Sequence, residues 1–486
     1  MTTFLQGFEA FQKQIDSSEL SALDFVSAAF RGDLGAVGIF VEAARGKLLY
    51  EKTAGNWFYY DATKHLWCAD PTQSHVLELT GKLWDECQAF VERTGDKLPA
   101  PARDAIQNWM KKLSSNSGRT GMQRMAQGER TIWTTEEKWD ANPYLLHFPN
   151  GVYDVETTEF REARPEDYLT RQTSAFYDPT AKCPLWEKTL LEIFSGRADV
   201  IEYFQRAIGY TALGLANGAA EQKMFLCFGP MGSNGKNTVM DTIAELLGSY
   251  AGTAANDSFN QSKEIPEDVH NMRQCRMIIA SEPDRRSQMN EEMIKALTGN
   301  REMRTRQLYE NSIVWTPRFC IWMLANHYPR VPNSHSLFRR FVVFPFMESF
   351  SGARKIFGLG KKLVDTEASG ILNWVIAGAR NWLKDNLEVR VPDVIRNAHK
   401  EFLDSTDIIR SFCEECLSVV EDCKAKTEAA SVFVTYRRYC EDNGYYALGR
   451  NRFYSELLTY GVESRTLTTG RIFTNIELKQ KGTLPI

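Results

Sequence analysis

The fold of this chain is decided by one stretch, Gly229-Pro-Met-Gly-Ser-Asn-Gly-Lys-Asn-Thr238, whose glycine and lysine spacing is typical of a phosphate-binding loop. The apolar run 224–228 before it predicts a buried strand. Apolar residues at helical spacing after it predict a helix that stops at Gly248. A strand, a glycine-rich turn and a helix in this order aim backbone N–H groups and a helix N-terminus at a phosphate. We therefore expect a nucleotide to bind here, and the alternative is a chance glycine-rich turn.

The residues expected to hold the phosphates are Gly229, Gly232, Ser233, Asn234, Gly235, Lys236, Asn237 and Thr238. Lys236 would add a point charge for the β and γ oxygens of ATP. Asn237 stands where a Ser or Thr usually supplies a hydroxyl to Mg²⁺, and Thr238 is next in line. Because Mg²⁺ prefers hard oxygen ligands, either the Asn237 side-chain oxygen or Thr238 binds the metal, or a water intervenes.

Composition indicates a globular protein of two to four domains, with 43% apolar and 25% charged residues in 486. The sequence contains no run of about eighteen apolar residues, so no membrane span is expected. The N-terminus lacks the pattern of a signal peptide. The ten cysteines are scattered, which favours reduced thiols and a cytoplasmic location. The Cys413 to Cys416 spacing, without a second such pair or nearby histidines, favours helix-face cysteines over a zinc site.

Charge is distributed unevenly along the chain, whose net charge is −4. Residues 270–345 hold twelve Lys or Arg against six Asp or Glu, and residues 431–486 hold eight against five. Two locally basic regions in an acidic chain suggest anion-binding faces, with ordinary solvated surface charge as the alternative.

The expected fold is multidomain α/β, with a helical N-terminal region, a P-loop ATPase core and a C-terminal winged helix. The expected division is 1–130 (mainly helical, with a β insertion), 131–215 (collar region), 216–350 (ATPase core), 351–395 (helical connector) and 396–486 (winged helix). Within the first region, residues 20–30 and 76–91 predict helices, 47–50 and 57–60 predict strands, and Lys111 to Gly121 predicts a polar loop. Residues 140–180 are rich in turn signals, and helices are expected near 184–194 and 200–213.

Three further apolar strands are predicted in the core, at 277–280, 319–325 and 341–344, and helix returns at 355–390. The first strand runs into Glu282, which we assign to Mg²⁺ and to polarising the attacking water; Asp284 is close enough to share this role. The second strand runs into Asn326, which could orient the water or contact the γ-phosphate. Because the carboxyl ends of parallel strands line the ligand crevice, both side chains are expected near the phosphate loop.

Positive charge for the transition state is expected from Arg339 or Arg340, acting on the site of a neighbouring subunit. Adjacent side chains on an extended chain point in different directions, so only one of the two is expected to act. The sequence leaves that choice open.

Residues 302–308 and 312–316 predict a hairpin whose tip contains Tyr309. Side chains alternate along a strand, so Arg304 and Arg306 would share one face of it. A basic hairpin with an aromatic residue near its tip suits a pore that grips a single-stranded backbone.

The C-terminal region predicts helices at 433–441 and 452–458, followed by two strands around Thr468-Thr-Gly470. Helix, helix and hairpin form the order of a winged helix, and Arg450, Arg452 and Arg471 would meet phosphates in such a fold. A winged helix used for protein contacts is the alternative.

Together these motifs resemble superfamily 3 helicases of the AAA+ class, and more narrowly the phage and plasmid primase-helicases with their poxvirus relatives. The resemblance covers roughly residues 45–480. It is carried by Gly229–Thr238, Ser281-Glu282, Lys295 to Arg306, Asn326 with Pro329, Arg339-Arg340 leading into Val343-Phe-Pro-Phe346, Phe148-Pro-Asn-Gly-Val-Tyr-Asp154, and Tyr436-Arg-Arg-Tyr-Cys-Glu-Asp-Asn-Gly444.

The resemblance implies a ring, usually a hexamer, that uses ATP and Mg²⁺ to translocate on single-stranded DNA and to open forked DNA. By position, Glu282 is its Walker B acid, Asn326 its sensor 1, Arg339 or Arg340 its arginine finger, and Lys295, Arg304 and Arg306 part of its DNA-contacting region. Many relatives carry an N-terminal primase domain for which this chain has no room. We therefore expect a separate primase or polymerase as partner, and no membrane.

Two other functions fit parts of the pattern. An origin-binding replication initiator would use the winged helix for sequence recognition and ATP only to switch assembly. A P-loop kinase would be active as a monomer and indifferent to DNA.

Overall fold

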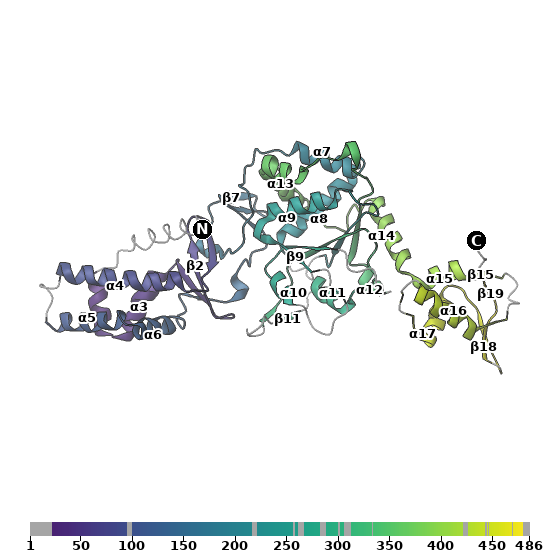
Figure 1. The fold of residues 1–486 in the computed structure, drawn as a ribbon. Helices are drawn as coiled ribbons and strands as arrows, with labels where there is room; N and C mark the ends of the chain where they lie inside the picture. The colour runs from purple at the N-terminus through teal and green to yellow at the C-terminus, as the bar shows by residue number, and fades with distance from the viewer. Residues whose placement is uncertain are drawn as a thin grey trace.

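The structure is a computed structural model. It describes residues 22–94, 100–215, 221–255, 258–260, 267–281, 288–299, 302–305, 313–332, 334–420, 426–442, 445, 447–468 and 470–479. Figure 1 shows a mixed α/β chain with a helical N-terminal part, a central part built around a sheet, and a small C-terminal part beyond α14. No helix among the described residues combines the length and apolar character needed to cross a membrane.

The N-terminal part packs helices against one face of a small sheet. The helices are α2 (Ala22–Phe30), α3 (Asp33–Ala44), α4 (Ser74–Thr94), α5 (Ala100–Leu113) and α6 (Asn116–Ala126). The strands are β1 (Leu48–Glu51), β2 (Asn56–Asp61), β3 (Leu66–Ala69) and β4 (Trp133–Thr134), in the order β3-β2-β1-β4. Buried Phe40, Trp57 and Trp109 lie in the core between these helices and the sheet. The predicted mixture of helices with a β insertion is confirmed for the described residues.

The predicted polar loop from Lys111 to Gly121 is wrong. Helix α5 continues to Leu113, and α6 begins three residues later at Asn116. The polar residues between them form a cap, in which the Ser115 hydroxyl accepts a hydrogen bond from the Gly118 N–H at 3.1 Å. Burial of Leu113 and Met122 then holds both helices in the core.

The turn-rich region that follows contains a sheet that the sequence did not predict. Strands β5 (Leu145–Phe148), β6 (Gly151–Asp154) and β7 (Glu159–Arg161) pair antiparallel in chain order. The 3₁₀ turns η2 (Glu136–Lys138) and η3 (Pro165–Asp167) flank this sheet. The expected helices follow as α7 (Pro184–Ile193) and α8 (Ala198–Leu213).

The central sheet has five parallel strands in the order β14-β8-β13-β10-β9. They are β8 (Met224–Phe228), β9 (Ala251–Ala254), β10 (Met277–Ser281), β13 (Cys320–Ala325) and β14 (Phe341–Pro345). Phe225 and Cys227 of β8 face one apolar cluster, while Met224 and Leu226 face the other, so the strand is buried on both faces. The predicted strands are confirmed, and β9 is an addition.

Helices cover both faces of this sheet. Helix α9 (Lys236–Leu247), α8 and the long α13 (Leu359–Lys384) share one cluster. On the other side lie α10 (Glu267–Met272), α11 (Glu291–Thr298), α12 (His335–Phe338) and α14 (Asp393–Thr406), together with the hairpin of β11 (Met303–Thr305) and β12 (Ile313–Trp315). The turns η5 (Gly248–Tyr250) and η6 (Gly352–Arg354) complete this part.

The C-terminal part begins with α15 (Ile408–Cys416) and continues through α16 (Ala429–Asp442) and α17 (Arg450–Thr459). Its strands are β15 (Leu417–Val419), β16 (Thr427–Glu428), β17 (Ser464–Leu467), β18 (Gly470–Phe473) and β19 (Ile476–Leu478). Strand β18 pairs with both β16 and β17, and β15 pairs with β19. The predicted sequence of two helices followed by a hairpin is therefore present.

Candidate functional site

The phosphate loop connects β8 to α9 by a backbone that glycine makes possible. Gly235 has φ of +81° and precedes the first residue of α9. A Cβ atom on Gly229 would lie 2.4 Å from the Asn234 side-chain nitrogen and 2.6 Å from the Phe346 carbonyl. Substitution at Gly229 would therefore push the Asn234 side chain or the Phe346 backbone out of place, while Gly232 has open space around it.

Lys236 is buried, with only 4% of its surface exposed, yet its ammonium group meets three oxygens. It donates to the Gly229 carbonyl at 2.9 Å, to the Asn234 side chain at 3.0 Å and to the Asn326 side chain at 2.9 Å. A buried lysine needs such partners because an unpaired charge would cost several kcal/mol. The lysine is thus held at the mouth of the loop, as the first residue of α9.

Asn326 reaches this position because β13 lies beside β8 in the sheet. The strands are parallel, with Ala325 opposite Phe228, and the Gly229 N–H donates to the Ala325 carbonyl at 3.1 Å. The two strands therefore end side by side, and the next residue of each chain segment lies at the same edge. The structure brings the Asn326 side chain into direct contact with the Lys236 ammonium.

The residues fit a nucleotide phosphate better than they define a metal site. The N-terminus of α9, the lysine and the glycine cradle suit an anion. Asn237 is exposed and Thr238 is half-buried in the first turn of α9, so both offer oxygens near the loop. Glu282 and Asp284 follow the carboxyl end of β10 but lie outside the described residues.

Two residues that the sequence did not single out support the loop from outside. The Phe350 N–H donates to the Ser233 carbonyl at 2.8 Å. A Cβ atom on Gly235 would meet the Ile193 side chain at 2.8 Å and the Phe350 ring at 3.9 Å. Both residues come from segments far from the loop in sequence, and no local pattern marks them.

The two candidate arginines have different environments. Arg340 is 8% exposed, and its guanidinium donates to the Thr298 hydroxyl at 3.0 Å and to the Ser336 carbonyl at 2.5 Å. Burial, and secondarily the like charge of Arg339, lower the pKa of Arg340. Arg339 is exposed and donates to the Gln222 side chain at 3.1 Å. Arg340 is therefore a packing residue, and Arg339 is the one that faces solvent.

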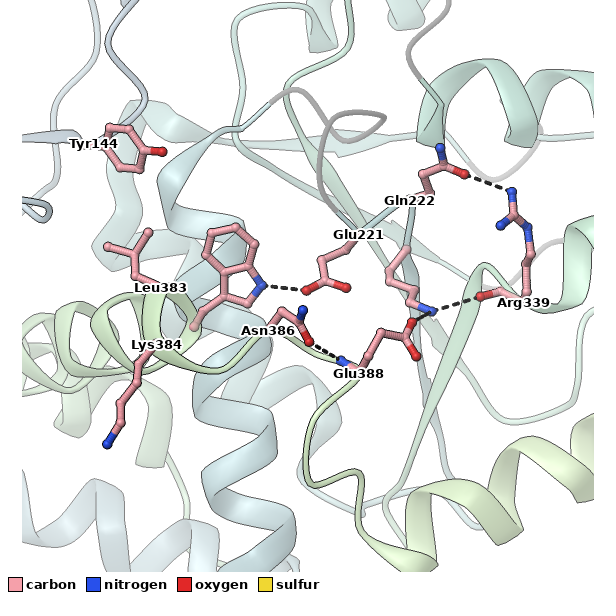
Figure 2. Close-up of a pocket in the computed structure, with 10 residues that line it drawn as sticks. Tyr144, Glu221, Gln222, Arg339, Leu383, Lys384, Asn386 and Glu388 are labelled. Atoms are coloured by element: carbon pink, nitrogen blue, oxygen red, sulfur yellow. Dashed lines mark hydrogen bonds and ion pairs between the residues drawn. The ribbon is translucent and has the colours of Figure 1, made fainter.

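Arg339 lies on a cavity of about 760 Å³ at the amino end of the central sheet (Figure 2). Lys223, just before β8, pairs with Glu388 at 2.7 Å and donates to the Arg339 carbonyl at 3.1 Å. The Glu221 carboxylate accepts from the Trp382 indole at 2.7 Å. This cavity lies at the edge opposite the phosphate loop, because β8 runs from Met224 beside it to Phe228 beside the loop.

The predicted hairpin is present in its described part. Arg304 lies opposite Val314 on the exposed face, while Met303 and Trp315 are buried. The Thr305 hydroxyl accepts from the Trp315 indole at 2.8 Å, which joins the two strands, and it lies 3.0 Å from a ring nitrogen of His270 in α10. Arg306 and Tyr309 lie outside the described residues. Lys295, in α11, is half-buried and forms an ion pair with Glu291.

The C-terminal arginines lie on the surface of the two helices and the hairpin. Arg450 lies over the Phe433 ring at 5.3 Å, and Arg471 lies over the Tyr454 ring at 5.5 Å. Arg452 is exposed, 3.9 Å from Glu456. The two aromatic rings hold their arginines near the surface by weak cation–π contacts.

Comparisons with protein families match three segments of the chain. Residues 38–195 match the family described as D5 N terminal like, and residues 405–477 match the family described as Poxvirus D5 protein-like. Residues 227–340, which contain most of the phosphate site, match a family of unknown function (DUF5906).

Three curated viral relatives carry helicase names. A putative helicase of Acanthamoeba polyphaga mimivirus is 23% identical over 332 residues, which are 63% of this chain and 34% of the viral protein. "Putative helicase 184R" of Invertebrate iridescent virus 6 is 26% identical, over 50% of this chain and 26% of its own length. "Putative helicase 121R" of Invertebrate iridescent virus 3 is 20% identical, over 70% and 39%. The matches thus span about a third of the length of these relatives.

Two solved structures of the NrS-1 C-terminal region align with TM-scores of 0.43 and 0.44 at 9% sequence identity. They cover 92% of this chain and 100% and 99% of those chains. Such TM-scores are too low to establish a shared fold. The family segments and the viral relatives together show that parts of this chain are similar to D5-like proteins and to viral proteins named putative helicases.

Proposed function

We propose that this protein is an ATP-dependent replicative DNA helicase of a phage or another mobile genetic element, of superfamily 3 and the AAA+ class. It assembles as a ring, as a hexamer, and hydrolyses ATP between subunits while moving on single-stranded DNA. The observation that carries the proposal is the contact of the buried Lys236 ammonium with Asn326 at the adjacent strand ends.

In this proposal the triphosphate lies on the loop from Gly229 to Thr238. The N–H groups at the start of α9 and the Lys236 ammonium bind its phosphate oxygens. Asn326 orients the attacking water or contacts the γ-phosphate, and Glu282 polarises that water. Mg²⁺, when bound by Glu282 with Asn237 or Thr238, would neutralise developing charge on the phosphates.

Arg339 is the proposed arginine finger. A five-residue strand spans about 16 Å, so an arginine at the amino end of β14 cannot reach the phosphate loop of its own chain. Exposed Arg339 can act only on the site of another copy, whereas Arg340 is committed to Thr298 and Ser336. A ring, in which each subunit faces the next, supplies that second copy.

DNA contact is proposed at two places. Arg304 and Arg306, with Tyr309 at the tip and Lys295 at the base, would grip one strand inside the ring. The C-terminal part would act as a winged helix, with Arg450, Arg452 and Arg471 on phosphates of the fork. Primer synthesis would fall to a separate primase or polymerase.

One set of assays tests the proposal. We expect ATP turnover that requires Mg²⁺ and rises with single-stranded DNA, together with displacement of a labelled strand from a forked duplex. Glu282→Gln should bind ATP but not turn it over. ATP turnover by a monomer, at a rate that DNA does not change, would support a P-loop kinase and contradict the proposed helicase function.

A replication initiator is the second candidate, favoured by the exposed arginines on the C-terminal helices and hairpin. An initiator would bind one duplex sequence tightly and would not displace a strand. Tight binding to random forked DNA, with strand displacement, would exclude it.

A further inference from the structure

Tyr328 lies two residues after Asn326 and touches the strand that leads into the phosphate loop. Its ring stacks on Phe228, with ring centroids 3.9 Å apart and planes 14° from parallel. Phe228 is the last residue of β8, directly before Gly229. Phe228, which precedes the loop, and Tyr328, which follows Asn326, are therefore joined by one stacked aromatic contact.

The same ring also meets helix α14. Its centroid lies 5.4 Å from that of Phe402, which is fully buried and packs on Phe341 of β14 at 5.1 Å. Helix α14 continues into α15 of the C-terminal part after Asp407. Tyr328 thus lies between the nucleotide site and the helix that carries the C-terminal domain.

The hydroxyl of Tyr328 does not explain this position. Among the described residues, none offers this buried oxygen a hydrogen bond. Burial, with the charge of Glu401, raises the pKa of Tyr328 to about 12, so the phenol stays neutral. The ring, rather than the hydroxyl, makes the contacts.

The residues after Tyr328 extend the same connection. The Met289 N–H donates to the Arg330 carbonyl at 2.9 Å, and Met289 leads into α11 and the hairpin. The Arg330 guanidinium lies over the Tyr445 ring at 4.9 Å, in the C-terminal part. A cavity of about 190 Å³ lies beside this contact and is lined by residues of both parts, among them Tyr328 and Tyr445.

We propose that Tyr328 is a positioning residue that holds Asn326 against Lys236 and makes this contact depend on the place of α14. If α14 moves when the C-terminal domain binds DNA, the ring moves with Phe402 and changes the packing of Phe228 and the place of Asn326. The inference rests on the proposed ATPase activity. It adds a physical route by which DNA binding would raise the rate of hydrolysis.

The test measures ATP turnover with and without single-stranded DNA for Tyr328→Leu and Tyr328→Phe. The leucine keeps apolar volume but removes the flat ring, and the phenylalanine keeps the ring and removes the hydroxyl. Phe319→Leu is the matched control, because Phe319 belongs to the same apolar cluster but precedes the opposite end of β13. Lys236→Ala is measured beside them, and melting temperatures confirm folding.

We expect Tyr328→Leu to lower kcat by about tenfold to a hundredfold, because the Asn326 side chain would no longer be held in position. We also expect this variant to lose most of the stimulation of ATP turnover by DNA. Its KM for ATP should change by less than about twofold, since Lys236 and the loop still hold the phosphates. Tyr328→Phe should behave as the wild type.

Three results would overturn the inference. They are Tyr328→Leu with wild-type kinetics, equal kinetic losses in Tyr328→Leu and Phe319→Leu, and a Tyr328→Phe variant as impaired as the leucine variant. If the wild-type protein hydrolyses ATP and this activity requires Lys236, each of these results leaves the proposed function intact. A wild-type protein without Lys236-dependent turnover would refute both.

Discussion

The two edges of the central sheet differ in a way that bears on how the protein works. At the carboxyl edge, Lys236, Asn234 and Asn326 converge within hydrogen-bond distance and are held by the ends of adjacent strands. At the amino edge, Arg339 is exposed on a cavity of about 760 Å³, beside the Lys223–Glu388 ion pair (Figure 2). One edge assembles a site within the chain, and the other presents a cation outward.

This difference suggests a division of labour between the edges. The phosphate site has its lysine and amide in place, and Arg354, which lies over the Phe350 ring beside the loop, is paired with Glu348. Arg339 lies at the opposite edge, where it cannot serve the same site. A second copy would bring the two edges together, and the following predictions test that arrangement.

The largest effect is expected at the carboxyl edge. Lys236→Ala removes the charge nearest the phosphates, and we expect ATP turnover to fall by at least about a hundredfold. Lys361→Ala, which removes an exposed charge paired with Asp365 on α13, is the matched control and should retain full turnover. Normal turnover in Lys236→Ala, measured by phosphate release, would remove the loop from the mechanism.

The next effect is expected at the amino edge. Arg339→Ala should lower the turnover of the assembled protein by about a thousandfold, the range seen when an arginine finger is lost. It should leave the melting temperature unchanged, because its side chain is exposed. An Arg339→Ala protein with full turnover would place the finger elsewhere.

Arg340→Ala sharpens the contrast between the two arginines. It removes a buried guanidinium from Thr298 and the Ser336 carbonyl, so we expect the free energy of unfolding to fall by about 2 kcal/mol. Chemical denaturation measures this change, and Arg339→Ala serves as its control. Equal stability of the two variants would contradict the assigned packing role.

The smallest effect is expected at the hairpin. Arg304→Ala removes one exposed charge and should weaken binding to single-stranded DNA by a few-fold. The slope of log affinity against log salt concentration should fall by about one, because one fewer counterion is released on binding. Basal ATP turnover should not change. Arg124→Ala, an exposed arginine on α6 of the N-terminal part, is the control, and equal DNA affinity of both variants would refute the hairpin contact.

The sequence predicted the central fold well where the signal is local. Strand β8, the loop and α9 follow from an apolar run, a glycine pattern and helical spacing. Strand β9 was missed because Ala251-Gly-Thr-Ala254 has almost no apolar side chain to mark it. The loop predicted at Lys111 to Gly121 was wrong because serine and asparagine near a helix start form a cap as readily as a loop.

For the candidate site, the sequence predicted which strand ends meet beside the loop, but not the contacts made there. Neighbouring strand ends implied that Asn326 lies near the loop, but not that it touches Lys236. The choice between Arg339 and Arg340 depends on Thr298 and Ser336, whose positions only the tertiary fold brings together. Glu282, Arg306 and Tyr309 lie outside the described residues, so their assigned roles stay predictions.

Mixing two inactive variants tests the central claim most directly. Lys236→Ala chains lack the phosphate lysine but keep Arg339, and Arg339→Ala chains have the reverse defect. If a site is completed by a neighbouring copy, mixed assemblies contain some sites with both residues, and ATP turnover should reappear on mixing to a clear fraction of the wild-type rate. If each chain completes its own site, the mixture stays as inactive as its components, and the account is contradicted.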